Sequence, residues 1–271
     1  MPTTATEPTA TTATPPATPP PALVTGAARG LGAAIARELA SRGHHVIVNY
    51  RSAASRAADV VRDIEAAGGS ASSARADVTD PSAVDELVAG ILATHGRIDT
   101  VVVNANTASP PFADLADLSW ADFEAKVTGE LAGAFHITKR VLEPMRARGA
   151  GRIVYIGSTA ADYVGDGRLA HGTAKSALAT FARHVASEGA RHGVSVLIVA
   201  PGAVRTPETE EMLEGARGVA LARESVLGRV LEPEDVAAAV ALAVDPALRP
   251  ATGTTLRVDG GWSVLAGGPT S

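Results

Sequence analysis

The stretch Thr25-Gly26-Ala27-Ala28-Arg29-Gly30-Leu31-Gly32 decides the fold of this chain, because it joins a short apolar run to a helical pattern. Its glycines permit a tight turn and let the backbone approach a bound group closely. The helix that begins there points unpaired N–H groups at the turn, which favours an anion such as a pyrophosphate. We therefore predict an α/β fold that binds a dinucleotide at the turn after its first strand.

Outward from this turn, short apolar runs alternate with longer amphipathic segments. The predicted strands are Ala22–Thr25, His45–Asn49, Ser70–Arg75, Ile98–Asn104, Arg152–Gly157, Val194–Ala200 and Thr254–Val258. The predicted helices are Gly30–Arg42, Ala53–Ala67, Pro81–His95, Ser119–Arg148, Ala170–His192 and Pro233–Val244. This order indicates right-handed crossovers, and so one doubly wound Rossmann domain over residues 22–271. We expect a seven-stranded parallel sheet with helices on both faces, and a candidate substrate lid at the weakly patterned residues 202–228.

The composition excludes several classes of function. Residues 1–21 are almost entirely Thr, Ala and Pro, which predicts a disordered tail rather than a secretory signal. A net charge of −5 without a basic stripe argues against a nucleic-acid partner, and no apolar run is long enough to span a membrane. There are no cysteines, and no His or carboxylate grouping has the spacing of a metal site. These features fit a cytoplasmic protein that acts on a small molecule.

The end of the second predicted strand bears on the choice of dinucleotide. The run Asn49-Tyr50-Arg51-Ser52 lacks the acidic residue that binds the ribose hydroxyls of NAD. Arg51 and Ser52 suit a 2′-phosphate instead, and Arg29 in the glycine turn is expected on the same side. Either arginine alone is compatible with a solvated surface charge, but the two together favour NADP(H).

These motifs resemble the short-chain dehydrogenase/reductase family, in particular its 3-oxoacyl-carrier-protein reductase-like branch, over about Ala22 to Trp262. Four later motifs carry the resemblance as well: Asp77-Val78, Asn104-Ala105, Pro201-Gly202 with Thr206, and Val258-Asp259-Gly260-Gly261. The resemblance implies a homodimer or homotetramer. It also implies an NADP(H) site made of Gly26, Arg29, Gly30, Leu31, Gly32, Arg51, Ser52, Asp77, Val78, Asn104, Ala105, Lys175, Pro201, Gly202 and Thr206.

The family reduces a carbonyl with a Ser–Tyr–Lys set that an Asn usually joins. Ser158 stands at the serine position and Lys175 at the lysine position, and the family spacings from both place the tyrosine at His171. The Asn position is Glu130. The resemblance therefore implies a catalytic set of Ser158, His171, Lys175 and Glu130, without the tyrosine. Asn106 and Gly157 are further departures from the family pattern.

The role of His171 stays open at this point. Histidine is the commonest general acid, but its imidazole reaches about 2 Å less far than a phenol, and a neighbouring Lys175 ammonium lowers its pKa. One hypothesis is that Glu130 offsets this effect, so that Glu130, His171 and Lys175 form one charge-balanced cluster. Otherwise His171 orients the substrate, or lines a site that has lost its redox activity.

Three functions follow from these alternatives. The first is an NADP(H)-dependent oxidoreductase acting on a ketone, enone or 3-oxoacyl-type substrate, either small or carrier-bound. The second is a non-redox cyclase, dehydratase or isomerase that uses His171 and Glu130 to transfer protons. The third is a nucleotide-binding partner subunit without turnover. The fold by itself does not choose among them. Asp162, Tyr163 and Asp166, in the loop after Ser158, are candidate substrate contacts.

Overall fold

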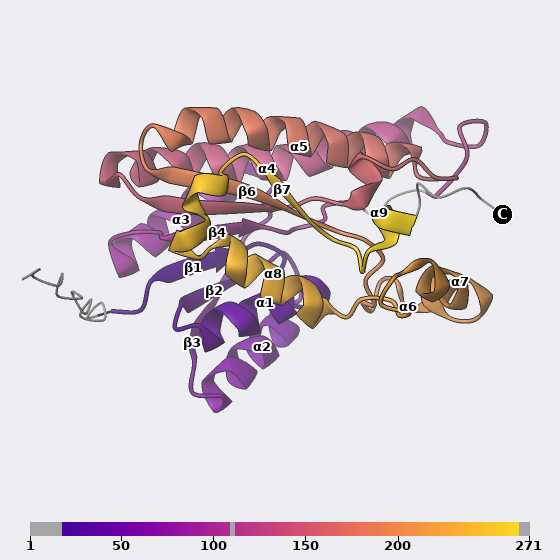
Figure 1. Ribbon diagram of the computed structural model, residues 1–271. Helices are drawn as coiled ribbons and strands as arrows, with labels where there is room; N and C mark the ends of the chain where they lie inside the picture. Colours follow the sequence, from indigo (N-terminus) through magenta and orange to yellow (C-terminus); the bar gives the residue numbers. More distant parts are fainter. Residues whose placement is uncertain (1–17, 109–111, 266–271) are drawn as a thin grey trace, which may run out of the picture.

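The computed structural model describes residues 18–108 and 112–265, and within them one parallel sheet forms the centre of the fold (Figure 1). The strand order is β3-β2-β1-β4-β5-β6-β7. The strands are β1 (Pro21–Val24), β2 (His45–Tyr50), β3 (Ser70–Arg75), β4 (Thr100–Val103), β5 (Gly151–Ile156), β6 (Val194–Pro201) and β7 (Thr255–Val258). The order reverses between β1 and β4, so the predicted doubly wound sheet is confirmed.

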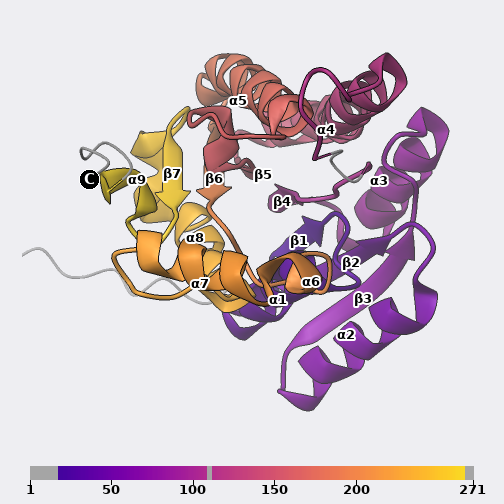
Figure 2. The same cartoon turned by 90° about the vertical axis from the view of Figure 1, so that its right-hand side faces the viewer.

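Helices cover both faces of this sheet (Figures 1 and 2). One layer holds α1 (Gly30–Ser41), α2 (Ala54–Ala66) and α8 (Pro233–Ala243), and the other holds α3 (Pro81–His95), α4 (Trp120–Arg148) and α5 (Leu169–Ala190). Alternate side chains of β1 serve the two layers, because successive residues of a strand point to opposite faces. Ala22 and Val24 pack in the α1 layer, whereas Leu23 packs in the α4 layer.

Local signals in the sequence set where these helices begin and end. The Asp80 side chain accepts a hydrogen bond from the Ser82 N–H at 2.9 Å, which caps the first turn of α3. Gly96 ends that helix in the left-handed conformation, with φ of 71°. Glu232 and Pro233 begin α8 in the same manner, through a capping box with Asp235.

Two predicted boundaries need correction. The domain begins before residue 22, because Pro21 is already in β1 and the Pro20 carbonyl accepts a hydrogen bond from the His45 N–H at 3.1 Å. Residues 1–17 of the predicted tail lie outside the described residues. The fourth strand covers only Thr100–Val103 of the predicted Ile98–Asn104. It ends early because the Asn104 N–H bonds the Thr25 hydroxyl instead of a neighbouring strand.

Most of the remaining segments surround the carboxyl edge of the sheet, whereas the turn Pro246–Ala251 lies at the opposite edge, before β7. The candidate lid folds into two short helices, α6 (Glu210–Leu213) and α7 (Ala216–Glu224), which lie beyond that edge (Figure 1). Two 3₁₀ turns, Thr159–Ala161 and Pro246–Ala251, and the short helix α9 (Trp262–Leu265) complete the described chain. No helix within these residues is long and apolar enough to cross a membrane.

Candidate functional site

The predicted site residues lie in segments that follow the strands at one edge of the sheet. The glycine turn follows β1, Asn104 follows β4, Ser158 follows β5 and Gly202 follows β6. These four strands are neighbours in the sheet, and all run in the same direction. Their carboxyl ends therefore form one continuous row, at the place where open α/β sheets bind ligands.

The glycine turn is built so that only glycine fits at its critical positions. Gly26 has φ of +64°, and a Cβ there would lie 2.9 Å from Ala105 Cα. A Cβ on Gly32 would lie 2.4 Å from the Gly26 carbonyl oxygen. Asn104 braces the turn, because its Nδ2 donates to the Thr25 carbonyl oxygen at 2.9 Å. The turn thus keeps backbone exposed for a phosphate to approach, which fits the predicted dinucleotide.

The two predicted phosphate-binding arginines are exposed and lightly held. The Arg51 guanidinium lies 4.0 Å from Asp77, with its side chain 63% exposed. Hydrogen bonds from the Thr79 N–H and hydroxyl lower the pKa of Asp77. Arg29 pairs instead with Glu208 of the lid, at 2.6 Å from Nε to Oε1. Ser52 is also exposed, next to Arg51.

Glu208 was not predicted as part of the site. It follows Pro207 in a polar stretch, and nothing in that pattern says that it returns to the first turn of the fold. Its Oε2 lies 3.2 Å from the position of a Cβ on Gly30, so the carboxylate sits over the glycine turn. An anionic side chain therefore contacts the place where the cofactor phosphate is expected.

The other predicted cofactor residues keep their places around the turn. Gly202 is tied to the last strand by a hydrogen bond from its N–H to the Val258 carbonyl at 2.9 Å. The Thr206 N–H donates to the Thr209 hydroxyl at 2.9 Å, which fixes the start of the lid. Val78 is buried and packs against Gly133 of α4. Pro201 is buried at the end of β6, and Leu31 and Ala105 are partly exposed.

Lys175 of α5 reaches the end of β5, the strand that Ser158 follows. The Ser158 hydroxyl oxygen accepts a hydrogen bond from the Ala160 N–H at 3.2 Å, which leaves its proton free to donate. The Lys175 ammonium donates to the Ile156 carbonyl at 2.9 Å, two residues before Ser158 in the chain. The first turn of α5 also packs on the segment after Ser158, since a Cβ on Gly172 would lie 2.8 Å from the Ala160 carbonyl oxygen.

Glu130 joins Lys175 to a third charged residue that the sequence reasoning missed. Glu130 accepts a hydrogen bond from Lys175 at 2.6 Å and from Lys126 at 2.9 Å. The three side chains are 9% exposed or less. Lys126 also donates to the Asn106 side chain at 2.7 Å and to the Ala108 carbonyl at 3.2 Å. We call Lys126, Glu130 and Lys175 the buried triad.

A signal for Lys126 was present in the sequence. It lies four residues before Glu130, the spacing of an ion pair on one helix face, and it is one of only three lysines in the chain. Asn106, noted only as a departure from the family pattern, is its partner in the loop after β4. The Asn-to-Glu change therefore goes with a second lysine one helical turn away.

The hypothesis of one charge-balanced cluster of Glu130, His171 and Lys175 holds only in part: Glu130 pairs with Lys175 and its charge raises the pKa of His171, but no hydrogen bond joins Glu130 to His171 among the described residues. Both Glu130 oxygens are occupied by the lysines, and His171 Nδ1 is buried without a hydrogen-bond partner among the described residues. The triad carries one more positive than negative charge, so the cluster is not balanced. Burial and then the Lys175 and Lys126 charges lower the pKa of His171 to about 4. The imidazole is therefore neutral at pH 7.

Glu130, in contrast to the neutral His171, is held in its ionised form. Burial by itself raises the pKa of its carboxyl, but the Lys175 and Lys126 ammoniums outweigh that effect and lower the pKa to about 2. Burial lowers the pKa of Lys126, against the attraction of Glu130. A carboxylate fixed in this way is a poor proton acceptor at neutral pH, so its contribution is to hold Lys175 in place.

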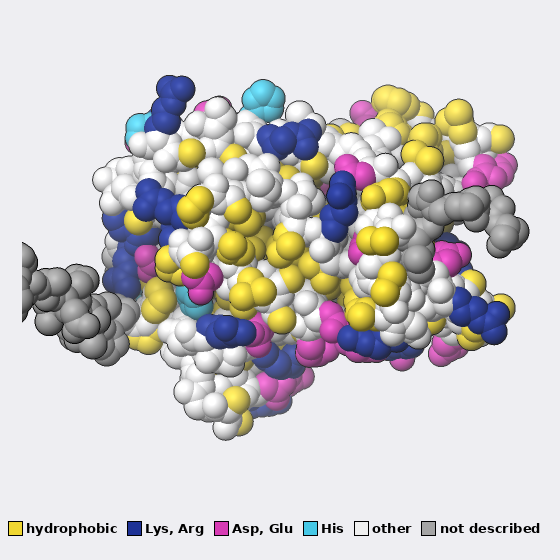
Figure 3. Space-filling view, viewed as in Figure 1, with side chains coloured by type: hydrophobic (Ala, Val, Ile, Leu, Met, Phe, Trp, Pro, Cys, Tyr) yellow, Lys and Arg dark blue, Asp and Glu magenta, His cyan; other side chains and the backbone are white. Residues whose placement is uncertain are grey.

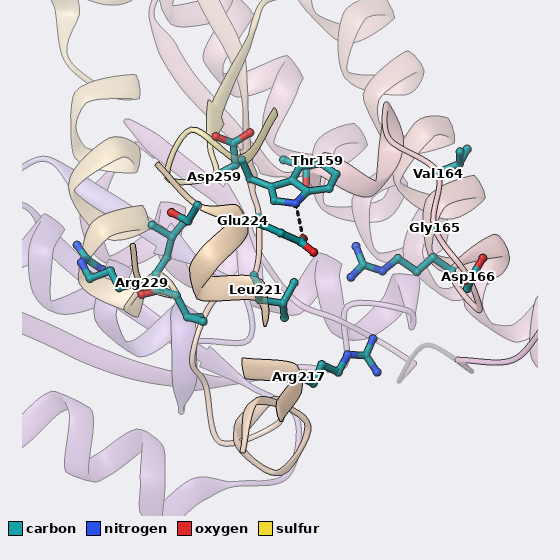
Figure 4. A pocket seen from close by; sticks show the side chains of 16 residues that line it. Thr159, Val164, Gly165, Asp166, Arg217, Leu221, Glu224, Arg229 and Asp259 are labelled. Atoms are coloured by element: carbon teal, nitrogen blue, oxygen red, sulfur yellow. Dashed lines mark hydrogen bonds between the residues drawn. The ribbon is translucent and has the colours of Figure 1, made fainter. Parts of the chain in front are cut away.

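A pocket of about 250 Å³ lies between the loop 159–168, the ends of β6 and β7 and the candidate lid, and its lining includes Thr159, the residue after Ser158 (Figure 4). Asp166, a candidate substrate contact, lines this pocket. Asp162 pairs with Arg257 at 2.8 Å instead. Tyr163 packs edge-on against Trp262, with ring centroids 5.2 Å apart. No group of three potential metal-binding side chains was found in the described part of the chain.

Comparison with known proteins places this architecture. A family model described as enoyl-(acyl carrier protein) reductase matches residues 26–263. A 3-oxoacyl-[acyl-carrier-protein] reductase of Synechocystis sp. is 37% identical over 241 residues, covering 89% of this chain and 95% of the relative. A short-chain dehydrogenase from Burkholderia cenocepacia, solved in complex with NADP, is 35% identical with a TM-score of 0.80, over 89% of this chain and 97% of that one.

A gluconate 5-dehydrogenase from the same organism, solved in complex with NADP and tartrate, has a TM-score of 0.85 at 27% identity. The match covers 91% of this chain and 96% of the gluconate 5-dehydrogenase chain. The sheet order, the glycine turn and these similarities agree over the same residues. The chain belongs to the short-chain dehydrogenase/reductase family of oxidoreductases.

Proposed function

We propose that this protein is an NADP(H)-dependent oxidoreductase that interconverts a carbonyl and a hydroxyl group on a small or carrier-bound substrate. The observation that carries the proposal is the position of Lys175, whose ammonium donates to the Ile156 carbonyl two residues before Ser158, at the carboxyl edge that also holds the glycine turn. Two solved relatives bind NADP, and the Synechocystis relative is named for a carrier-bound 3-oxoacyl substrate.

The residues present fit the cofactor. The glycine turn and the start of α1 would hold the pyrophosphate, and Arg51 with Ser52 would hold the 2′-phosphate. Arg29 would join them after releasing Glu208. When bound, the nicotinamide supplies or accepts a hydride.

Ser158 polarises the substrate oxygen. Its own oxygen already accepts the Ala160 N–H, so its proton is directed outward, where it donates to the carbonyl. Lys175 uses two of its three N–H groups on Glu130 and Ile156, which leaves one for the cofactor ribose. Glu130 fixes that ammonium through an oxygen 2.6 Å away.

His171 delivers the proton from a small imidazolium population. With a pKa of about 4, about one molecule in a thousand carries the acid form at pH 7. The reduction rate should therefore rise as the pH falls from 7 toward 5. A tyrosine at this position would not show this dependence, because a phenol stays protonated throughout that range.

The low pKa of His171 also favours a second candidate, a nucleotide-binding subunit without turnover. A non-redox enzyme that uses Glu130 as a base has less support, because both Glu130 oxygens are engaged and its pKa is about 2. The oxidoreductase and the nucleotide-binding subunit differ in one observable, the oxidation of NADPH by a carbonyl substrate.

The decisive experiment titrates NADPH and NADH against the pure protein, and then follows reduced-nicotinamide absorbance with a panel of ketones, enones and 3-oxoacyl thioesters. We expect tighter binding of NADPH, and oxidation with at least one substrate that rises toward pH 5 and disappears in Ser158→Ala. Tight NADPH binding without oxidation would favour the subunit. The His171→Tyr variant then separates a weak oxidoreductase from a subunit without turnover. A gain of about 100-fold in the rate on neutral ketones would mean that the site lacked only an effective acid.

We also propose that the protein forms a dimer or tetramer through α4 and α5. Phe135 of α4 is 47% exposed, and its ring lies 6.4 Å from that of Phe181 on α5. An exposed aromatic ring beside a partly buried one on the adjacent helix is typical of a subunit contact. Mass measurement of Phe135→Glu beside the wild type tests this contact, with a shift to monomer expected.

A further inference from the structure

The pocket that Thr159 lines contains more charge than a neutral substrate requires. Its lining includes three arginines and three carboxylates, on walls formed by the 159–168 loop, the lid and the ends of β6 and β7. Acidic and basic side chains also gather on the outer surface over α6 and α7 (Figure 3). Charged groups that already have partners inside the protein are not available to a ligand.

Three of these six groups have partners. Arg229 makes two hydrogen bonds to Asp235, at 2.6 and 2.8 Å. Glu224 accepts the indole N–H of Trp262 at 2.9 Å, the dashed line in Figure 4. Asp259 accepts backbone N–H groups at 2.9 and 3.2 Å, from Gly261 and Ser263.

Within the described part of the chain, the other three groups, the Arg168 and Arg217 guanidiniums and the Asp166 carboxylate, form no ion pair. Neither Arg168 nor Arg217 has a carboxylate within 4.0 Å among residues 18–108 and 112–265, although both line the pocket. Arg168 extends along Gly165, whose Cβ position lies 3.5 Å from its Cδ. Arg217 projects from the lid toward the Gly165 loop, while Asp166 lies at the outer edge of that loop (Figure 4).

The position of Arg168 connects this pair to the site. It directly precedes α5, and its carbonyl accepts the Gly172 N–H at 2.8 Å, so it lies within one turn of His171. Burial, the two lysines and the Arg168 charge all lower the pKa of His171. An anion bound to Arg168 would cancel part of that repulsion, so more of the imidazole would carry the proton.

We propose that Arg168 and Arg217 form an anion-binding subsite, and that the substrate carries a carboxylate or phosphate group which these two arginines grip while its carbonyl meets Ser158. The subsite rests on the proposed function for its substrate, but its binding of anions stands independently of turnover. A guanidinium fork suits both anions, because each offers two oxygens in one plane. Leu221 and Trp262 supply apolar walls of the pocket for the part of the substrate between its anionic group and its carbonyl.

The test measures binding separately from chemistry. Calorimetry on the NADP-loaded protein uses two probes that cannot be reduced: succinate for a carboxylate and 4′-phosphopantetheine for a phosphate. We expect at least one probe to bind, and Arg168→Gln and Arg217→Gln each to weaken it about tenfold. Arg223→Gln, on the same helix as Arg217 but outside the pocket lining, is the matched control and should bind like the wild type. The tighter probe identifies the source of the anion.

Turnover supplies the second arm. A 3-oxo acid and its methyl ester are compared by kcat/KM, and we expect the acid to be favoured at least tenfold, with the preference lost in Arg168→Gln. Probe binding that is absent in the wild type, or unchanged in both arginine variants, overturns the subsite. If succinate is the tighter probe, equal turnover of acid and ester overturns the claim that the subsite grips the substrate, while leaving the oxidoreductase function intact. Probe binding that depends on both arginines, with no turnover of any substrate, keeps the subsite and overturns the oxidoreductase instead.

Discussion

The nucleotide end and the chemical end of the carboxyl edge hold their charges in opposite ways. At the nucleotide end, Arg29 and Glu208 meet with side chains about half exposed, 54% and 46%. At the chemical end, Glu130 lies between two lysines with its side chain 4% exposed. Exposed pairs exchange partners at little cost, whereas buried charges are fixed by their neighbours. The nucleotide end is thus suited to receive an anionic cofactor. The chemical end is suited to hold its charged side chains in one fixed arrangement.

Removing the central carboxylate should give the largest effect. Glu130→Gln leaves two buried ammoniums without their counter-charge, which should lower the free energy of unfolding by about 3–5 kcal/mol. Glu208→Gln, at the exposed end, should cost less than about 1 kcal/mol. Urea denaturation of both variants at pH 7 measures the difference. Equal stability of the two variants would contradict the contrast between the ends.

The pH dependence of stability should also come largely from the chemical end. His171 has a pKa of about 4 in the folded protein and about 6.5 when unfolded, so the unfolded chain binds the proton first as the pH falls. Stability should therefore be complete above pH 6.5 and decline by up to about 3 kcal/mol toward pH 4. Glu130, with a folded pKa of about 2, adds a further loss below pH 4.5.

Urea midpoints of His171→Gln between pH 7 and 4.5 test this assignment, and the variant should lose much of the wild-type slope. His44 and His45, whose pKa values burial also lowers, account for a remaining slope in both proteins. His184→Gln, at an exposed position on the same helix, is the control. A wild-type slope in His171→Gln would place the acid sensitivity elsewhere.

At the nucleotide end, Arg51→Ala should reduce the preference for NADPH over NADH about tenfold, because one charge-assisted contact to the 2′-phosphate is lost. Fluorescence titration with both cofactors measures the ratio. Arg62→Ala, an exposed arginine of α2 that pairs with Asp59, should leave the ratio unchanged. If both variants show the same preference for NADPH over NADH, Arg51 does not contact the 2′-phosphate.

The smallest effect is expected from Glu208 as a competitor for the cofactor. Glu208→Gln frees Arg29 and removes an anion from above Gly30, so NADPH should bind a few-fold more tightly. The gain should shrink in high salt, which screens exposed charges. Weaker binding in this variant would mean that Glu208 supports the closed lid instead of opposing the cofactor.

Much of the fold could be predicted from local pattern. The strand Ser70–Arg75 and the helix Pro81–His95 have the predicted bounds, since caps such as Asp80 and Gly96 act within a few residues. The bounds that differ depend on distant partners. β4 ends early because Asn104 turns to Thr25, and β1 begins at Pro21 because β2 lies beside it.

The sequence by itself determined the parallel sheet and the glycine turn, because periodicity and spacing follow from the chain alone. The choice of Ser158, His171 and Lys175 as site residues rests in addition on the family resemblance. Only the tertiary structure decided how the charges meet. The packing of α4 on α5 buries Lys126 with Glu130 and Lys175, and the fold-back of the lid brings Glu208 to Arg29. Whether an ion pair is fixed or exchangeable depends on the water around it, and the path of the chain in space decides how much water remains.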